Sequence, residues 1–223
     1  MVLGKVRQEE QAPTSLISNE PLGDLRFRNL LSAQEWASLP QAVRRRFSKR
    51  VAAGETVVYA GKIACTRLTG IGWLIGQVAR LCGGPLPVAA FDDVPAVVTI
   101  TEDMVTDGQV WTRVYARRDG FPQVIHSSKR FGGPTGLEEH VGRGVGMELS
   151  VHVEDGQLAF RSVRYFVRFR GWTLFLPIWL SPGALTVTHA EKGDGHFTFT
   201  LDVTHPWFGP VIHQSACFRE VLI

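Results

Sequence analysis

The chain is poor in cysteine and has no long hydrophobic run. Its three cysteines lie far apart and are odd in number: Cys65, Cys82 and Cys217. They fit neither a disulfide framework nor a zinc-binding spacing, and such usage is typical of a reducing compartment. The longest apolar stretch, residues 70–84, is interrupted by Gln77 and Arg80 and is too short to span a bilayer. We therefore expect a cytoplasmic protein without a transmembrane segment.

The chain also lacks a strong charge bias and the local motifs of several large enzyme classes. Its 24 Lys and Arg residues barely exceed its 21 Asp and Glu residues, which gives a formal net charge of +3. So small an excess gives no reason to expect a nucleic-acid partner. No GxGxxG follows a strand pattern, no HExxH or Cys/His spacing marks a metal site, and no GxSxG marks a serine nucleophile. We expect neither a cofactor nor a metal.

The beginning of the chain divides into a polar segment and a helical one. Residues 1–24 are polar and aperiodic, which predicts a mobile tail before a single α+β domain over residues 25–223. A capping-box pattern predicts a short helix over residues 32–39, and a proline begins a second helix over residues 40–51. Five basic residues cover the second helix: Arg44, Arg45, Arg46, Lys49 and Arg50. A solvated face is the simpler interpretation, and an anionic partner is the alternative.

The remaining elements indicate a mainly β fold. Residues 55–67 predict a strand, bulged at Gly61, and residues 71–82 predict an apolar helix packed on the sheet. Beyond Pro95 the chain is almost wholly β, with turn signals at short spacing. We expect an α+β, mainly β fold whose strongly curved antiparallel sheet forms a half-barrel or barrel, a lipocalin-like or steroid-transfer-like shell with N-terminal helices. Pro177 makes the apolar segment 172–182 an edge strand or an overlying loop.

Residues 136–153 are the most informative stretch, because one face of this predicted long strand is very apolar. Glu139 and Arg143 lie on that face, and three glycines opposite them suggest bends. A carboxylate that points into an apolar cavity has a raised pKa and can act as an acid or base. The alternative is that Glu139 forms a buried ion pair with an arginine of a neighbouring strand, such as Arg113.

Several segments, in this order along the chain, resemble a bacterial family called domain of unknown function 4166. The segments are LPQAVRRRF (39–47), VWTRVY (110–115), FPQVIHSSKRF (121–131), GLEEHVGRGVGMEL (136–149), LFLPIWLSPG (174–183) and HFTFTLDVTHP (196–206). The resemblance extends over residues 39–218 and carries no catalytic residue with it. Members also occur fused to reductases resembling saccharopine dehydrogenase, which makes a separate reductase or biosynthetic enzyme a candidate partner.

Two functions from different classes fit these observations best. The first is the binding of a hydrophobic small molecule or acyl-type ligand in an internal cavity of the curved sheet. Its candidate ligand-binding residues are Trp111, Tyr115, Arg143, Met147, Tyr165 and Trp179. The second is a cofactor-independent enzyme, a cyclase or isomerase, with Glu139, His126 and Arg113 as catalytic candidates. A third hypothesis is an interaction domain that uses the basic helix face and the segment 172–182.

Overall fold

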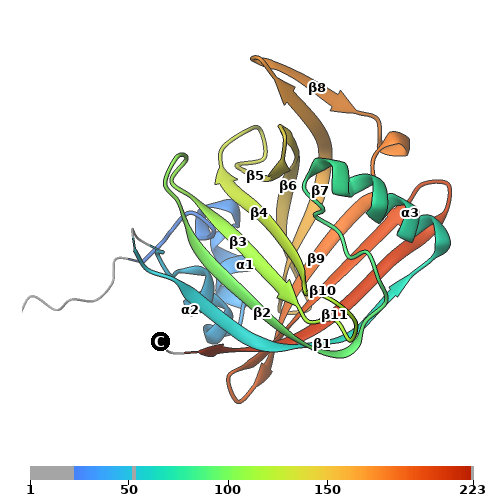
Figure 1. Ribbon diagram of the computed structural model, residues 1–223. Coiled ribbons are helices and arrows are strands. Elements are labelled where there is room, and N and C mark those ends of the chain that lie inside the picture. The colour runs from blue at the N-terminus through green and yellow to red at the C-terminus, as the bar shows by residue number, and fades with distance from the viewer. Residues whose placement is uncertain (1–22, 52–53, 222–223) are drawn as a thin grey trace, which may run out of the picture.

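The computed structural model describes residues 23–51 and 54–221, which form a barrel of antiparallel strands with short helices around it (Figure 1). The strands are β1 (Val57–Leu68), β2 (Asp92–Asp103), β3 (Gly108–Tyr115), β4 (Gln123–Phe131), β5 (Leu137–Gly142), β6 (Val145–Glu154), β7 (Gln157–Phe169), β8 (Trp172–Leu176), β9 (Ala184–Gly193), β10 (His196–His205) and β11 (Gly209–Val221). The α-helices are α1 (Ala33–Ser38), α2 (Gln41–Phe47) and α3 (Gly70–Ala79). Short 3-10 turns are η1 (Arg28–Leu30), η2 (Arg80–Cys82) and η3 (Ile178–Leu180).

The barrel is closed by the pairing of β6 with β7. The strands follow the order β6-β5-β4-β3-β2-β1-β11-β10-β9-β7 around it. Strand β8 pairs with the second half of β7 and projects beyond the barrel as an edge strand (Figure 1). The predicted mainly β fold with a strongly curved antiparallel sheet is confirmed. The closed form corresponds to the lipocalin-like shell rather than to a half-barrel.

The stretch predicted as one long strand is a hairpin of β5 and β6. Arg143 and Gly144 form its turn, and both have positive φ angles, 50° and 78°, as a type I′ turn requires. In this register Glu139 pairs with Met147 and His140 pairs with Gly146. A register shift separates these pairs from the Gly142–Val145 pair at the turn, so their residue numbers have equal parity. The period of two therefore continues across the turn and imitates a single strand. The expectation that Arg143 lies on the apolar inner face is wrong, because this residue is exposed in the turn.

Helices α1 and α2 pack on the opposite side of the molecule from α3 (Figure 1). The predicted capping box is present, with Ser32 Oγ accepting from Glu35 N at 3.2 Å. Helix α2 ends at Phe47 instead of Val51, yet Val43 and Phe47 are buried as the stripe predicts. These helices bury their apolar side chains in a core shared with β6 and β7.

The basic side chains on and just after α2 are not all solvated, because two of them form ion pairs with strands of the barrel. The Arg46 side chain is only 7% exposed and pairs with Glu191 at 3.2 Å. Lys49 pairs with Glu220. Because these two side chains are held by the barrel wall, they are not free to form a continuous cationic surface for an anionic partner.

The first residues of the described chain are already part of the fold. Of the predicted tail, residues 1–22 lie outside the described residues, and only residues 23 and 24 are described. Asp24 is buried, and its backbone N donates to Ser48 O at 2.7 Å. The bulge expected at Gly61 lies instead between Ile63 and Cys65. Gly61 serves a close approach, because a Cβ there would lie 2.0 Å from Cys217 O.

Helix α3 lies across one end of the barrel, which we call the mouth. Gly72 lets it approach closely, because a Cβ at this position would lie 2.0 Å from Val211 O. The helix was expected to bury a broad apolar stripe on the sheet. Instead Trp73, Leu74 and Val78 are each more than half exposed. Leu74 and Val78 border the interior of the barrel, so part of the apolar surface of α3 faces the opening instead of packing on the sheet.

Candidate functional site

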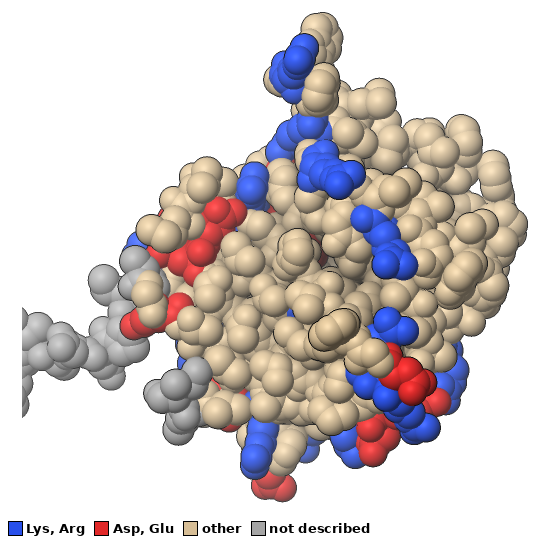
Figure 2. Space-filling view, in the orientation of Figure 1, with Lys and Arg blue, Asp and Glu red and all other residues tan. Residues whose placement is uncertain are grey.

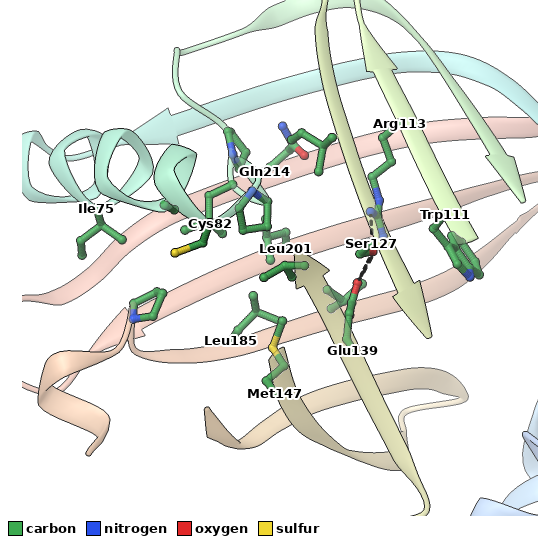
Figure 3. Close-up of a pocket in the computed structure, with 18 of the residues that line it drawn as sticks. Ile75, Cys82, Trp111, Arg113, Ser127, Glu139, Met147, Leu185, Leu201 and Gln214 are labelled. Carbon is green, nitrogen blue, oxygen red and sulfur yellow. Dashed lines mark hydrogen bonds and ion pairs between the residues drawn. The ribbon is translucent and has the colours of Figure 1, made fainter. Parts of the chain in front are cut away.

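A pocket of about 410 Å³ lies inside the barrel (Figure 3). Inward-facing side chains of strands β2 to β7 and β9 to β11 line it, and α3 borders it at the mouth. Most of these side chains are apolar, and they include Val98, Ile125, Val141, Met147, Leu185 and Leu201. The lining is therefore a nearly continuous hydrophobic surface that encloses a volume within the range of small-molecule sites.

One side of the pocket carries four polar side chains, which we call the charged cluster: Arg113, Ser127, Lys129 and Glu139. The Glu139 carboxylate accepts from Lys129 Nζ at 2.8 Å and from Ser127 Oγ at 2.6 Å. Arg113 Nη2 lies 3.7 Å from the same carboxylate, and Arg113 Nη1 donates to Ser127 Oγ at 3.2 Å. The Lys129 and Glu139 side chains are 7% and 9% exposed. The cluster is thus a buried ion network in an apolar wall.

The strand register explains why these side chains meet. Pairing of β4 with β5 sets Lys129 directly opposite Glu139. Pairing of β3 with β4 sets Arg113 opposite Ile125, one inward position from Ser127. Directly opposed residues share a face of the sheet and have their Cβ atoms about 5 Å apart. Three successive hairpin strands therefore bring the cluster together on the inner face.

The pKa of Glu139 is lowered, contrary to the expectation from burial alone. Burial raises it, but the charges of Lys129 and Arg113 and the hydrogen bonds from Lys129 and Ser127 outweigh that effect. Burial lowers the pKa of Lys129, and the charge of Glu139 opposes this shift. Glu139 is consequently an ionised carboxylate at neutral pH. As a base it is weak, because its oxygens already accept hydrogen bonds from Lys129 and Ser127 and lie beside the charge of Arg113.

The structure brings six of the nine predicted site residues together around the pocket. Arg113 and Glu139 belong to the charged cluster, and the other lining residues are Trp111, Tyr115, Met147 and Tyr165. His126 is exposed, on the opposite face of β4 from Ser127. Arg143 is exposed in the β5–β6 turn. Trp179 lies outside the pocket at the mouth, where it stacks on Trp207 with ring centroids 5.7 Å apart.

Lys129 and Ser127 were not among the predicted site residues, although the sequence holds a signal for both. Alternation along residues 121–131 places them on the same face as Ile125. A lysine on an otherwise buried face calls for a buried partner, and Glu139 on the next predicted strand is the nearest candidate. The signal was obscured because the neighbouring Arg130 and Ser128 make this segment look uniformly polar.

The fold and the pocket define this chain as a closed antiparallel barrel with a charged cluster in a largely apolar interior. Within that class, the chain belongs to the family described as Domain of unknown function (DUF4166), which matches residues 39–218. This match confirms the resemblance noted in the sequence. No curated protein and no solved structure matches the chain. In the part of the chain that the structure describes, no helix combines the length and apolarity needed to cross a bilayer.

Proposed function

We propose that this protein binds a hydrophobic small molecule or acyl-type ligand inside the barrel. The observation that carries the proposal is the 410 Å³ pocket, with its largely apolar lining. Water gains few hydrogen bonds in such a space, whereas an apolar ligand removes its own surface and that of the wall from water. Glu139 lies on the pocket wall. A ligand cavity lined by the apolar strand face that carries Glu139 requires this position.

We further propose that the protein is a carrier that exchanges its ligand with a separate enzyme. A barrel that holds an apolar molecule acts as a carrier when the molecule is passed to or from a separate reductase or biosynthetic enzyme. The mouth under α3 is the side from which such an exchange would proceed, because residues of α3 line the pocket directly. We assign the protein to the cytoplasm, on the ground that Cys65, Cys82 and Cys217 are all unpaired.

Binding is tested by native mass spectrometry of the purified protein and by titration with the neutral fluorescent probe N-phenyl-1-naphthylamine. The variant Val187→Trp places a large ring in the pocket, since Val187 lines it. The matched control is Thr188→Trp, because its neighbour Thr188 faces outward on the same strand β9. We expect Val187→Trp to weaken probe binding at least tenfold and Thr188→Trp to leave it unchanged. Equal binding by the wild type and a folded Val187→Trp protein would contradict the proposal.

A second candidate function is a cofactor-independent cyclase or isomerase, and the charged cluster is the observation that favours it. Arg113 and Lys129 present positive charge to the pocket and could stabilise negative charge that develops on a bound substrate. Glu139 orients both groups. His126 would take no part, because it lies outside the pocket.

The enzyme is tested by incubating the recovered ligand with the protein and separating the products by chromatography. Catalysis predicts a product of unchanged mass and altered retention time, whose formation is lost in Glu139→Gln while the melting temperature is retained. An unchanged ligand contradicts catalysis. A Glu139→Gln protein that unfolds identifies Glu139 as a structural ion partner.

A further inference from the structure

The charge on the pocket wall is unbalanced. Among the described residues that line the pocket, three side chains are charged: Arg113, Lys129 and Glu139. Two are cations and one is an anion. Glu139 is also the one carboxylate of the described residues that lies within ion-pair distance of either cation. When Lys129 is protonated beside Glu139, the wall of an otherwise apolar pocket carries one positive charge in excess.

Arg113 is the side chain on which this excess is available to a ligand. Lys129 is engaged at 2.8 Å by Glu139 and is closely surrounded, because its side chain is only 7% exposed. The Arg113 side chain is 23% exposed, and its Nη2 is 3.7 Å from Glu139, beyond a good hydrogen bond. A guanidinium has five N–H donors in a planar fork, and one of them is committed to Ser127 Oγ. The remaining donors can bind a planar anion.

The apolar part of the pocket lies beside this charge. Figure 3 shows Arg113, Ser127 and Glu139 grouped on one side and Ile75 and Cys82 at the α3 side, with Leu185 and Leu201 between them. A ligand that filled the pocket would meet charge at one end and hydrocarbon along the rest. An unpaired charge in such surroundings is costly, and an anionic group supplies its partner.

We infer that the ligand is an amphiphile with a single anionic head group, which Arg113 binds beside the Lys129–Glu139 pair, and a hydrocarbon tail that extends toward α3. This inference rests on the proposed binding function and names the ligand class. A carboxylate matches the Arg113 fork most directly, and a phosphate monoester shares the same chemistry. The tail supplies most of the buried apolar area, whereas the head sets orientation and selects against neutral and cationic molecules.

Calorimetric titration with ligands of one tail length tests this assignment: dodecanoate, dodecyl phosphate, dodecanol and dodecyltrimethylammonium. We expect the wild type to bind an anionic ligand at least tenfold more tightly than dodecanol, and the cationic ligand most weakly. The ratio of dodecanoate to dodecyl phosphate affinity separates the two anions. Arg113→Met should bring the anion-to-alcohol ratio close to one, and Arg113→Lys should retain part of it. The control Arg161→Met removes an exposed arginine of β7 and should keep the wild-type ratio.

The outcomes separate this inference from the function on which it rests. Equal binding of dodecanoate and dodecanol by the wild type overturns the anionic head group and leaves hydrophobic binding standing. Preference for the cationic ligand also overturns it. If no ligand binds and none displaces the neutral probe, both proposals fail. The wild-type ratio decides the question even if Arg113→Met does not fold.

A separate observation concerns the outer surface of the mouth. Large apolar side chains are exposed there, and we call five of them the apolar rim: Trp73, Leu81, Trp172, Leu180 and Trp207. Their exposed fractions are 52%, 67%, 83%, 61% and 67%. Residues of α3 and η3 line the pocket from this side, and Figure 1 shows β8 and α3 at the same end of the barrel. Exposed apolar patches this extensive mark interaction surfaces.

The charge around the apolar rim identifies what it fits. Arg170 lies beside Trp172 at the tip of the β7–β8 hairpin, and Arg80 is exposed next to Leu81. Arg168, also exposed, pairs with Glu138, which is itself buried. On the face that Figure 2 shows, the projecting part at the top carries Lys and Arg without Asp or Glu. Tryptophan with arginine around an apolar patch is the composition that favours the interface of an anionic bilayer.

We propose that the apolar rim docks this end of the barrel on an anionic lipid surface. Co-sedimentation with vesicles of phosphatidylcholine alone and with one quarter phosphatidylglycerol tests it. We expect binding to the anionic vesicles, weakened by salt, and at least a tenfold loss in Trp172→Glu. The control Val105→Glu adds the same charge at an exposed apolar site of the β2–β3 turn and should bind as the wild type. Absence of vesicle binding overturns the proposal. So does a dimer, found by ultracentrifugation, that Trp172→Glu dissociates, because the rim is then an interface between copies.

Discussion

His189 is wholly buried between α2 and the barrel wall, where its ring stacks on Phe197 with centroids 5.0 Å apart. Its Nε2 lies 3.1 Å from Nη1 of Arg46, whose guanidinium also covers the Phe197 ring at 3.9 Å. A protonated imidazole would face a positive charge without water to screen it. Burial and the charge of Arg46 accordingly lower the pKa of His189 to about 3. The ring is therefore neutral in the folded protein at every pH near neutrality.

This lowered pKa predicts a pH-dependent loss of stability. Above pH 6.5 His189 is neutral in both states and contributes nothing to the pH dependence. As the pH falls from 6.5 toward 3, the unfolded chain takes up a proton that the folded protein excludes. The free energy of unfolding should then fall by up to about 1.4 kcal/mol per pH unit through this group. In His189→Phe this contribution should vanish, whereas that of His140, whose pKa burial also lowers, remains; the lost Arg46 contact shifts the whole curve.

Urea unfolding of both proteins at pH 7, 6, 5 and 4.5 measures this difference. Carboxylates such as Glu139 contribute equally to both curves, so the difference between the two curves isolates His189. Parallel curves for the wild type and His189→Phe would contradict the assignment of the lowered pKa to this residue.

Single residues show where prediction from sequence succeeds and where it stops. The alternation of residues 136–153 correctly places Glu139 on an inner, apolar face, and it offers a buried ion pair as an alternative to catalysis. It cannot give the direction of the pKa shift, because that depends on Lys129 being directly across β4. Cross-strand register is a relation between two strands, and no pattern within one strand contains it.

At the scale of elements, the turn of the β5–β6 hairpin was not predicted because its sequence lacks the usual signal. Asn-Gly or Asp-Gly is the usual signal for a type I′ turn, whereas this chain has Arg143 and Gly144. Arg143 adopts a φ of 50°, which costs an ordinary L-residue about 1 kcal/mol. The burial of α3 was mispredicted for a different reason. Periodicity reports that α3 has an apolar face, but not whether the surface beneath it is a sheet or an opening.

The strained turn predicts a stabilising substitution. Arg143→Asn should raise the free energy of unfolding by about 0.5 kcal/mol, since asparagine tolerates the left-handed region and the Arg143 side chain is exposed in the turn. Arg143→Ala removes the same charge without this backbone preference, and it should give no gain. The midpoint of urea unfolding measures both. A similar gain in both variants would attribute the effect to charge instead of to the turn.

At the scale of the whole molecule, the sequence did not determine whether the curved sheet closes into a barrel or remains a half-barrel. Hairpin signals predict that neighbouring strands pair, and they account for β2 to β5 in order and for the pairing of β6 with β7. Closure depends on β1 pairing with β11, elements from the two ends of the described domain. It also depends on β7 pairing with β9 along its first half, which leaves its second half to β8. These long-range pairings distinguish a barrel from a half-barrel, and local periodicity contains no information about either.

The same difference between local and long-range pairing predicts the order of folding. Closing the chain between β1 and β11 costs loop entropy that the β3–β4 hairpin avoids, so the hairpin should form first. Two buried isoleucines offer a matched test: Ile125 of β4 is 3% exposed and Ile63 of β1 is 0% exposed. Each Ile→Val change should destabilise the protein by about 1 kcal/mol. Stopped-flow measurements should show that Ile125→Val chiefly slows folding, while Ile63→Val chiefly accelerates unfolding. The reverse pattern would mean that the barrel is nucleated by the contact of its two ends, and that its hairpins are completed around a seam already formed.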